Sequence, residues 1–217
     1  MKTIRYILAM DTSAGSVSAC VYDCKNDKSL SDEYQKNIAF SQGEVIIPLL
    51  DGVIEKSGIK KSQIDAVGVC RGPGFFTGMR IGLSTAKALA LGLDVPIYGV
   101  DALSVIAFEN NDKKLTVIQE TKRSDFYVAK FEGGVMLNSI QALEPENISI
   151  CDDVLVGSGV KRFLGDKKIK NKVINQDYPT SVGVAGLISY NIKNAIDCSD
   201  TQALYLRCAD VQMPNKK

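Results

Sequence analysis

Two short polar turns carry the residues whose types and spacing could do chemistry in this chain of 217 residues. In the first, "DTSAGS" (11–16), Asp11 and Thr12 offer a carboxylate and a hydroxyl that could position a metal-bound phosphate. The second, "RGPGFFTG" (71–78), lies between an apolar run and a helical pattern. A helix that starts from a glycine turn presents backbone amides that can bind an anion. The two turns therefore raise the hypothesis of a phosphate or nucleotide site.

The glycine turn matches neither of the two common phosphate-binding fingerprints. A P-loop needs a Lys-Ser/Thr pair directly after its last glycine, but Met and Arg follow Gly78. The dinucleotide fingerprint needs a third glycine where Thr77 stands. One interpretation is a phosphate on the amides of the helix start, with Arg80 as the counter-charge. The other is structural, with Gly72 and Gly74 turning the chain and Thr77 capping the helix.

The amino-acid composition limits which catalytic and binding sites the chain can form. The chain contains no histidine, and its six cysteines are scattered without a CxxC pair. This excludes histidine metal ligands and Ser-His or Cys-His nucleophile pairs, so we predict no metal site and expect buried, reduced thiols. The net charge is +1, from 26 basic and 25 acidic residues, which does not indicate a general affinity for nucleic acid. The basic run "KRFLGDKKIKNK" (161–172) is either an RNA contact or a solvated surface turn.

The hydrophobic pattern of the first half predicts the element order β-β-β-α-β-α-β-α. The expected strands cover 4–10, 16–22, 30–38, 64–70 and 96–100, and the expected helices cover 44–58, 77–93 and 101–108. Ser41 and Glu44 form a capping-box pattern, and Asp101 is placed to cap the third helix. The β-α-β portions imply parallel strands with right-handed crossovers, added to an antiparallel meander.

The second half restarts after 110–113, where we place a boundary between two α/β subdomains, 1–110 and 111–217. Strands are expected over 115–119, 126–131, 135–142 and 154–156, and a helix over 182–196 with Thr180 or Ser181 as its cap. The apolar runs fall short of the roughly 20 residues that span a bilayer, and the N-terminus reads as a strand, not a signal peptide. We therefore expect a cytoplasmic protein without membrane contact.

The order of elements, the Asp-Thr-Ser hairpin and the Gly-Pro-Gly-x-x-Thr-Gly-x-Arg-x-Gly turn together resemble the TsaB (YeaZ) family. The similar stretches are 7–23, 41–54, 67–90 and 96–107, with weaker patches at 120–131 and 203–212. Members of this family are the dimerisation subunit of the bacterial complex that makes threonylcarbamoyladenosine in tRNA. The sequence departs from the family in one place, because Gln42 and Gly43 stand where a histidine commonly opens the first helix.

The resemblance implies an actin-like, sugar-kinase-like (ribonuclease H-like) fold whose second subdomain is reduced. It implies a non-catalytic partner of TsaD and TsaE, with no catalytic residues of its own. The reaction is threonylcarbamoyl transfer to N6 of the adenosine 3′-adjacent to the anticodon, in tRNAs reading codons that begin with A. The isolated chain is expected to hold no cofactor and to touch tRNA weakly or indirectly, and the resemblance leaves open whether it forms a homodimer when alone. ATP or ADP and magnesium would enter with the assembled complex.

The first two helices carry more apolar surface than one sheet face requires, and the resemblance implies that they bind the partner. The residues expected at that interface are Ile46, Leu50, Val53, Gly82, Leu83, Ala86 and Leu89. The alternative function is a kinase-like nucleotide-binding protein that uses Asp11, Thr12 and the loop Gly72–Gly78.

Overall fold

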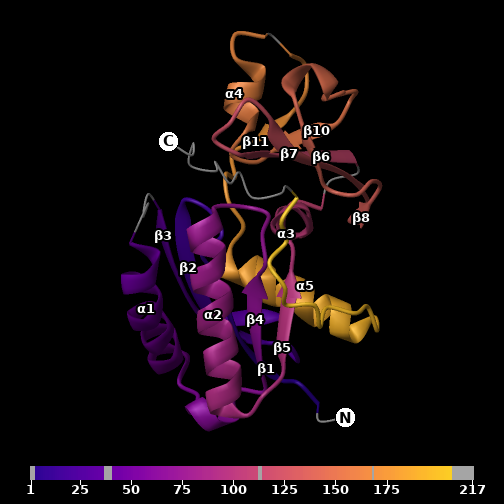
Figure 1. Ribbon diagram of the computed structural model, residues 1–217. Helices are drawn as coiled ribbons and strands as arrows, with labels where there is room; N and C mark the ends of the chain where they lie inside the picture. Colours follow the sequence, from indigo (N-terminus) through magenta and orange to yellow (C-terminus); the bar gives the residue numbers. More distant parts are fainter. Residues whose placement is uncertain (1–2, 37–40, 112–113, 168, 207–217) are drawn as a thin grey trace, which may run out of the picture.

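The computed structural model describes residues 3–36, 41–111, 114–167 and 169–206. The chain forms two lobes with one sheet each (Figure 1). The sheet of lobe 1 contains β1 (Tyr6–Asp11), β2 (Ser16–Asp23), β3 (Lys28–Lys36), β4 (Ala66–Cys70) and β5 (Ile97–Val100). Its helices are α1 (Gln42–Ser57), α2 (Phe76–Leu93), α3 (Ala102–Glu109) and α5 (Ser181–Lys193), with a short η1 turn (Lys61–Gln63). The order expected for the first half is confirmed, although residues 37–38 of the third expected strand lie outside the described residues.

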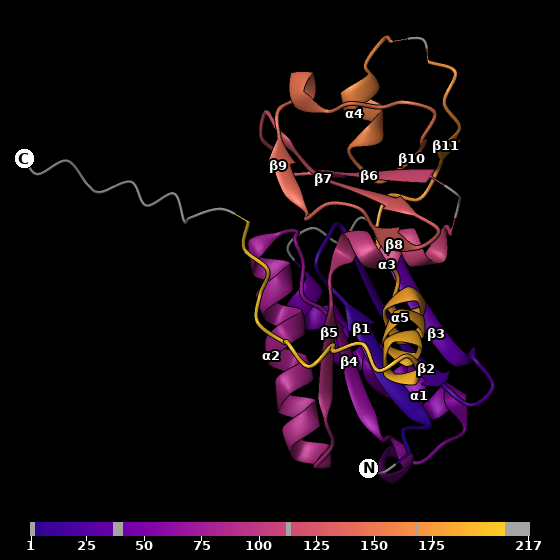
Figure 2. The same cartoon turned by 90° about the vertical axis from the view of Figure 1, so that its right-hand side faces the viewer.

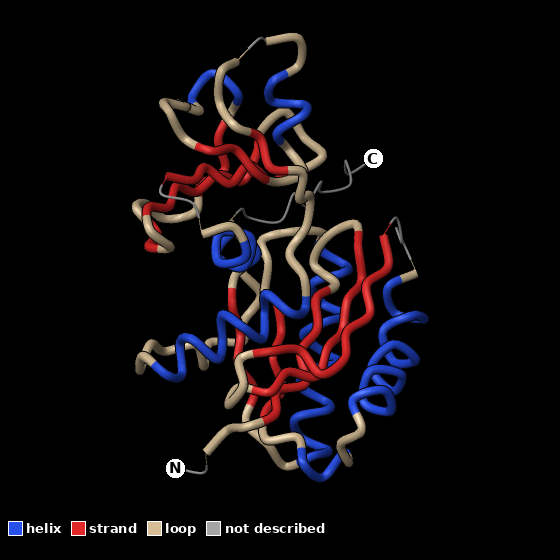
Figure 3. The backbone as a smooth tube through the Cα atoms, turned by 180° about the vertical axis from the view of Figure 1, so that it is seen from behind, coloured by secondary structure: helices blue, strands red, loops and turns tan. Residues whose placement is uncertain are grey.

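The sheet of lobe 1 has the order β3-β2-β1-β4-β5. The pairs β1–β2 and β2–β3 are antiparallel, whereas β1–β4 and β4–β5 are parallel, as the β-α-β pattern predicts. Helices α1 and α2 cover one face, and α5 with α3 covers the other (Figures 1 and 2). Seen from behind in Figure 3, α5 runs across the strands of the sheet.

The central strand β1 is buried on both faces, which explains its continuous apolar run. Because side chains alternate along a strand, Ile7 and Ala9 pack with the α3 and α5 side. Leu8 and Met10 pack with the α1 and α2 side. The strand therefore ends at Asp11 in a fully buried environment, and this places the carboxylate of Asp11 between the helical layers.

Lobe 2 is a smaller sheet with the order β11-β10-β6-β7-β8, and β9 also pairs with β7. The strands are β6 (Lys114–Glu120), β7 (Phe126–Glu132), β8 (Val135–Met136), β9 (Gln141–Leu143), β10 (Val154–Val156) and β11 (Val173–Ile174). One face packs toward α3 of lobe 1, and the other is covered by α4 (Val160–Leu164) near a short η2 turn (Pro145–Asn147). Phe126 meets Phe163 of α4 edge-on, with ring centroids 6.1 Å apart.

Several details of the second half differ from the sequence prediction. The strand expected over 135–142 is split into β8 and β9, because Asn138 turns back and its Oδ1 accepts a hydrogen bond from the Lys130 amide. The short elements α4 and β11 were not expected. The predicted boundary at 110–113 falls between α3 and β6, with 112–113 outside the described residues. Helix α5, from the second half of the chain, packs against β1, β2 and β4 of lobe 1.

The helix ends are partly as predicted. Asp101 and Thr180 each accept a hydrogen bond from an amide three residues on, so both predicted caps are confirmed. The capping box at Ser41 is wrong, because the Ser41 side chain makes no cap hydrogen bond. Gly58 ends α1 in the left-handed conformation, with φ of 73°.

The cysteines are mostly as expected. Cys20, Cys24, Cys70 and Cys198 are buried free thiols, whereas Cys151 is exposed, which corrects the expectation for that residue; Cys208 lies outside the described residues. Within the described residues, no helix is long and apolar enough to cross a membrane.

Candidate functional site

The two polar turns singled out from the sequence lie against each other at one end of the lobe 1 sheet. The Thr12 hydroxyl donates a hydrogen bond to the Gly78 carbonyl oxygen at 2.7 Å. The Phe75 amide donates one to the Ser13 carbonyl oxygen, also at 2.7 Å. The hairpin turn after β1 is therefore bound directly to the loop that starts α2.

Close approach of these two segments explains the glycines of the second turn. A Cβ atom at Gly74 would overlap the Ser13 carbonyl oxygen, and one at Gly78 would overlap the Thr12 carbonyl oxygen. One turn further along α2, a Cβ at Gly82 would overlap the Thr12 hydroxyl. Gly72 has a φ of +93°, which L side chains rarely adopt. The space that a phosphate would need beside these glycines is filled by the chain's own backbone.

Asp11 is a fully buried carboxylate of this region. Its Oδ1 accepts hydrogen bonds from the Ser13 amide at 3.0 Å and from the Ser13 hydroxyl at 2.6 Å. Its Oδ2 is buried and has no hydrogen-bond partner among the described residues. Burial raises the pKa of Asp11 from 3.8 to about 6, against the lowering effect of these hydrogen bonds. The carboxylate is placed inside the protein, under the hairpin turn.

Two predicted members of the phosphate site have other roles. Thr77 lies within the first turn of α2, and Phe75 is the residue before the helix, so the expectation that Thr77 caps it is wrong. The Arg80 guanidinium lies 3.8 Å from the Phe76 ring centroid, and its Nε donates a hydrogen bond to the Tyr205 hydroxyl at 3.0 Å. Arg80 thus contacts the C-terminal segment of the described chain.

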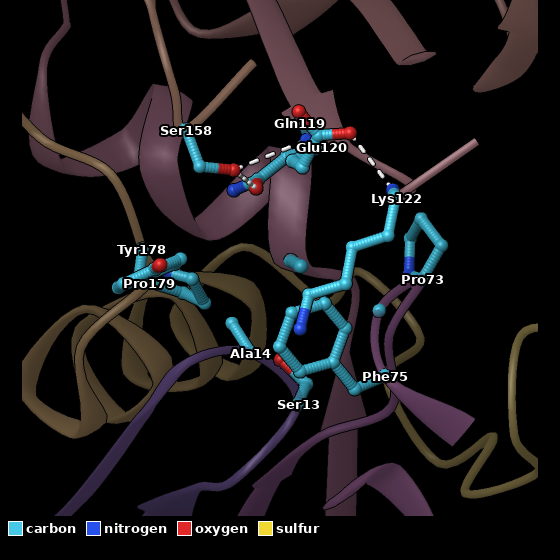
Figure 4. Close-up of a pocket in the computed structure, with 12 residues that line it drawn as sticks. Ser13, Ala14, Pro73, Phe75, Gln119, Glu120, Lys122, Ser158, Tyr178 and Pro179 are labelled. Carbon is cyan, nitrogen blue, oxygen red and sulfur yellow. Dashed lines mark hydrogen bonds between the residues drawn. The ribbon is translucent and has the colours of Figure 1, made fainter. Parts of the chain in front are cut away.

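A small cleft lies between the lobes above these turns (Figure 4). Lobe 1 contributes Ser13, Phe75 and the start of α3, and lobe 2 contributes the end of β6 and the loop before α4. The Ser158 hydroxyl donates to Gln119 Oε1 at 2.7 Å and accepts from the Glu120 amide at 3.1 Å. These hydrogen bonds, dashed in Figure 4, hold the lobe 2 wall together.

The cleft is small for a nucleoside triphosphate, the ligand of kinases with this type of fold. Its volume is about 110 Å³, whereas sites for small molecules measure roughly 300–1,000 Å³. Three glycines that could face phosphates instead face Thr12 and Ser13. Among the residues that the structure describes, no group of three His, Cys, Asp or Glu side chains could hold a metal ion. Of the seven candidate cofactor residues, Asp11, Thr12, Gly74 and Gly78 meet at the hairpin turn, whereas Gly72 faces Met79, Thr77 is exposed on α2 and Arg80 contacts Tyr205.

The residues predicted at a partner interface need correction. Ile46, Leu50 and Val53 of α1 and Leu83 and Ala86 of α2 are at most 5% exposed, and they form the core between these helices and the sheet. Gly82 is also buried, and Leu89 is partly buried against the same core. The helical period that identified the apolar stripe marks the face that meets the sheet, so the buried members of the set are not available to a partner.

The outward faces of α1 and α2 present different residues. Ile47 of α1 is 49% exposed and Leu91 of α2 is 85% exposed. Glu44 and Glu55 are exposed on α1, and Lys87 is exposed on α2. Large exposed apolar side chains on adjacent helices indicate a contact surface when they are grouped. Ile47 and Leu91 are therefore exposed apolar positions that lie outside the predicted interface set.

The basic run at 161–172 is partly committed to internal contacts. Arg162 makes hydrogen bonds to both oxygens of Glu120, at 2.7 and 2.8 Å, and lies 3.8 Å from the Phe126 ring centroid. Phe163 is buried. Lys168 lies outside the described residues, so the run is only partly tested as a surface.

The comparisons with known proteins match a TsaD family model and relatives that are named TsaB. The model of the family "tRNA N6-adenosine threonylcarbamoyltransferase" (TsaD) matches residues 40–196. The chain is 26% identical to "tRNA threonylcarbamoyladenosine biosynthesis protein TsaB" of Buchnera aphidicola subsp. Baizongia pistaciae, over 87% of this chain and 90% of that protein. It is 37% identical to TsaB of Buchnera aphidicola subsp. Schizaphis graminum, over 46% of each chain, and 28% identical to that of Escherichia coli, over 58% of this chain and 54% of that one. The chain belongs to the TsaB (YeaZ) family.

Solved structures agree with the TsaB fold. YeaZ from Pseudomonas aeruginosa superposes with a TM-score of 0.79 at 20% identity, over 94% of this chain and all of that one. A polyphosphate/ATP-glucomannokinase from Arthrobacter matches with a TM-score of 0.50 at 10% identity, over 88% of this chain and 99% of that one. The actin-like, sugar-kinase-like fold expected from the sequence is therefore confirmed.

Two residues near the start of α2, Lys122 and Tyr205, were not predicted from the sequence. The Lys122 ammonium lies 4.2 Å from the Phe75 ring centroid, and Lys122 has a positive φ of 59°. Tyr205 contacts the first turn of α2 from more than a hundred residues away. No local sequence pattern predicts a positive φ at a lysine or a contact between residues so far apart in the chain. The two phenylalanines at 75–76, in contrast, could be seen in the sequence.

Proposed function

We propose that this chain is a non-catalytic scaffold subunit in the synthesis of threonylcarbamoyladenosine in tRNA. It pairs with the catalytic subunit TsaD, and the assembly includes TsaE. The relatives named TsaB are called biosynthesis proteins for this nucleoside, which supports a role in that process. ATP or ADP and magnesium belong to the assembled complex in this proposal. The complex acts on tRNA in the cytoplasm.

One observation carries the non-catalytic part of the proposal. The backbone of Thr12 and Ser13 fills the space beside Gly74 and Gly78, where a kinase of this fold would hold phosphate. The packing leaves the Asp11 side chain fully buried beneath the turn. A chain built in this way supplies a stable surface to another subunit.

The outward faces of α1 and α2 are the surface that we assign to the catalytic partner. Ile47 and Leu91 supply apolar contacts there. Exposed acidic residues on α1, Glu44 and Glu55, and the exposed Lys87 on α2 give the two helices opposite charge. In a related partner with the same pair of helices, the acidic α1 of each chain would lie against the basic α2 of the other. This charge complementarity favours one orientation of pairing. The same geometry allows a homodimer when TsaD is absent.

The proposal is tested by reconstituting the reaction with tRNA, ATP, threonine-derived threonylcarbamoyl adenylate, TsaD and TsaE. Modified nucleoside, measured by mass spectrometry of digested tRNA, is expected with this chain present and not with this chain alone. Product formed at the same rate without this chain would contradict the scaffold role. Product formed by this chain without TsaD would contradict its being non-catalytic.

A second candidate is the kinase-like nucleotide-binding protein. The observation in its favour is Asp11, a carboxylate with an unpartnered oxygen at the cleft end of β1. Nucleotide binding would require the hairpin turn to separate from the glycine turn, breaking the hydrogen bonds from Thr12 and Phe75. Calorimetric titration of the isolated chain with ATP and magnesium tests it, because submicromolar binding would favour this candidate over the scaffold.

A further inference from the structure

An exposed cluster of aromatic and cationic side chains lies where the first turn of α2 reaches the lip of the cleft. We call it the aromatic–cation cluster, and its members are Phe75, Phe76, Arg80, Lys122 and Tyr205. They come from α2, the turn between β6 and β7, and the C-terminal segment. The sequence analysis did not predict that these five residues lie together.

The cluster is held together by ring contacts. The Phe76 and Tyr205 rings lie 5.6 Å apart between centroids. The Arg80 guanidinium lies 3.8 Å from the Phe76 centroid and is fixed by its hydrogen bond to the Tyr205 hydroxyl. Lys122 lies 4.2 Å from the centroid of the Phe75 ring. The aromatic faces thus orient both cations.

The two cations of the cluster differ in charge balance from the cations that are paired with carboxylates. Arg71, Arg162 and Lys56 each pair with a carboxylate. Within the described residues, Arg80 and Lys122 have no carboxylate partner, so their charge is available to an outside group. Phe75 precedes α2 without a side-chain cap, so the positive end of the helix dipole adds to the same region.

The aromatic rings are exposed in spite of their size. Phe76 is 52% exposed and Tyr205 is 46% exposed. Exposed rings beside uncompensated cations favour an occupant that is both aromatic and anionic. Unpaired nucleotides have these two properties, because their bases stack on aromatic side chains and their phosphates contact cations.

We infer that the aromatic–cation cluster binds unpaired nucleotides of an RNA, with bases on Phe76 and Tyr205 and phosphates at Arg80 and Lys122. This inference rests on the proposed function for the source of the RNA. It also replaces the basic run 161–172 as the main candidate for RNA contact. In that run Arg162 is paired with Glu120, and the rings of Phe126 and Phe163 that its cations contact are both buried.

The test measures fluorescence anisotropy of labelled RNA with the full chain at fixed salt. The probes are a synthetic anticodon stem–loop with an unpaired loop and a fully paired RNA duplex. We expect the stem–loop to bind more tightly than the duplex. Replacing Phe76 or Tyr205 with alanine should weaken stem–loop binding roughly 5- to 150-fold, the range for loss of one stacked base. Lys25→Ala, an exposed lysine in the turn between β2 and β3, and Tyr190→Ala, a half-exposed ring on α5, are matched controls that should bind like the wild type.

The salt dependence tests the phosphate contact separately. Arg80→Ala should reduce the slope of log affinity against log salt by about 0.7, the value for one phosphate contact on a single strand. Equal affinity of the wild type, Phe76→Ala and Arg80→Ala for the stem–loop would overturn the inference, as would equal affinity for the duplex. Loss of TsaD binding in these variants with unchanged RNA binding would also overturn it, and would make the cluster a protein contact.

Failure of this inference and failure of the proposed function give different results. The scaffold role is tested by complex formation and product without any measurement of RNA binding to this chain. If TsaD still binds and product still forms while the cluster variants retain full RNA affinity, only the RNA inference is overturned. Thermal melting of each variant shows that it is folded, since all these side chains are at least partly exposed.

Discussion

Replacing Asp11 with asparagine removes a buried charge while keeping the shape of the side chain. In the wild type, Asp11 Oδ1 accepts hydrogen bonds from the Ser13 amide and hydroxyl, and an asparagine oxygen can accept the same two. The other oxygen has no partner among the described residues, so the charge there is poorly compensated. Burial raises the pKa of Asp11 from 3.8 to about 6. The charged form is therefore less stable in the folded chain than in the unfolded one.

The sign and size of the effect on stability follow from this shift. Between pH 3.8 and about 6 the folded state keeps the Asp11 proton and the unfolded state releases it. The folded state then binds more protons, and its free energy of unfolding falls as the pH rises through this window. A shift of about 2 pKa units corresponds to about 3 kcal/mol, which is lost in full above pH 6. Asp11→Asn does not undergo this loss.

The assay is urea unfolding of the wild type and Asp11→Asn at several values from pH 4 to pH 8. The asparagine NH₂ group replaces an unpartnered oxygen and costs about 1–3 kcal/mol at every pH. The test is therefore how the difference in free energy of unfolding between the two proteins changes with pH. We expect the variant to gain on the wild type by up to about 3 kcal/mol as the pH rises to 7. A difference that stays flat, or that favours the wild type more at higher pH, would refute the account of Asp11.

Asp23 provides a control of opposite sign. Burial acts to raise its pKa, but hydrogen bonds from the Asn26 side chain and from the amides of Lys25 and Asn26 lower it overall. Its charge stabilises the folded state above the unfolded pKa, and that stability is lost as the pH falls through the folded value. Asp23→Asn should therefore lose stability relative to the wild type as the pH rises.

Three further predictions concern the packing of the two lobes. Gly74→Ala should lower the free energy of unfolding, measured by chemical denaturation, by about 2 kcal/mol or more, because the new Cβ meets the Ser13 carbonyl. Gly92→Ala is the control: its Cβ has open space, so it should be neutral or stabilising by about 0.4–1 kcal/mol. Arg162→Ala should lower the free energy of unfolding by about 1.5–3 kcal/mol through loss of its bonds to Glu120, measured against the exposed Lys161→Ala as control. Ile46→Asp should prevent folding, because it places a charge in the core, and a soluble variant with wild-type circular dichroism would contradict this.

The local signals in the sequence predicted the architecture of lobe 1 well. Continuous apolar strands and the change to a helical period gave the order of elements, and Asp101 and Thr180 marked their helices correctly. The short elements of lobe 2 were harder to predict. The break between β8 and β9 depends on Asn138 reaching back to Lys130, a tertiary contact with no sequence period.

The candidate site was predicted less well for a physical reason. A stripe such as Ile46, Leu50 and Leu83 identifies the face that is buried, but it does not say whether a sheet or another chain buries it. The role of the glycines could not be decided from sequence either, since it depends on the position of the Thr12 and Ser13 backbone. Contacts such as Arg80 with Tyr205 join residues that are distant in the chain.

Complex formation with TsaD tests the central claim most directly. Size-exclusion chromatography with light scattering should show a 1:1 heterodimer of the wild-type chain and TsaD. The double variant Ile47→Asp and Leu91→Asp alters only exposed positions on α1 and α2, so it should stay folded and lose the heterodimer. Val135→Asp, at a 66% exposed position on β8, should retain it. A folded double variant that still co-elutes with TsaD, or a wild-type chain that does not, would contradict the account.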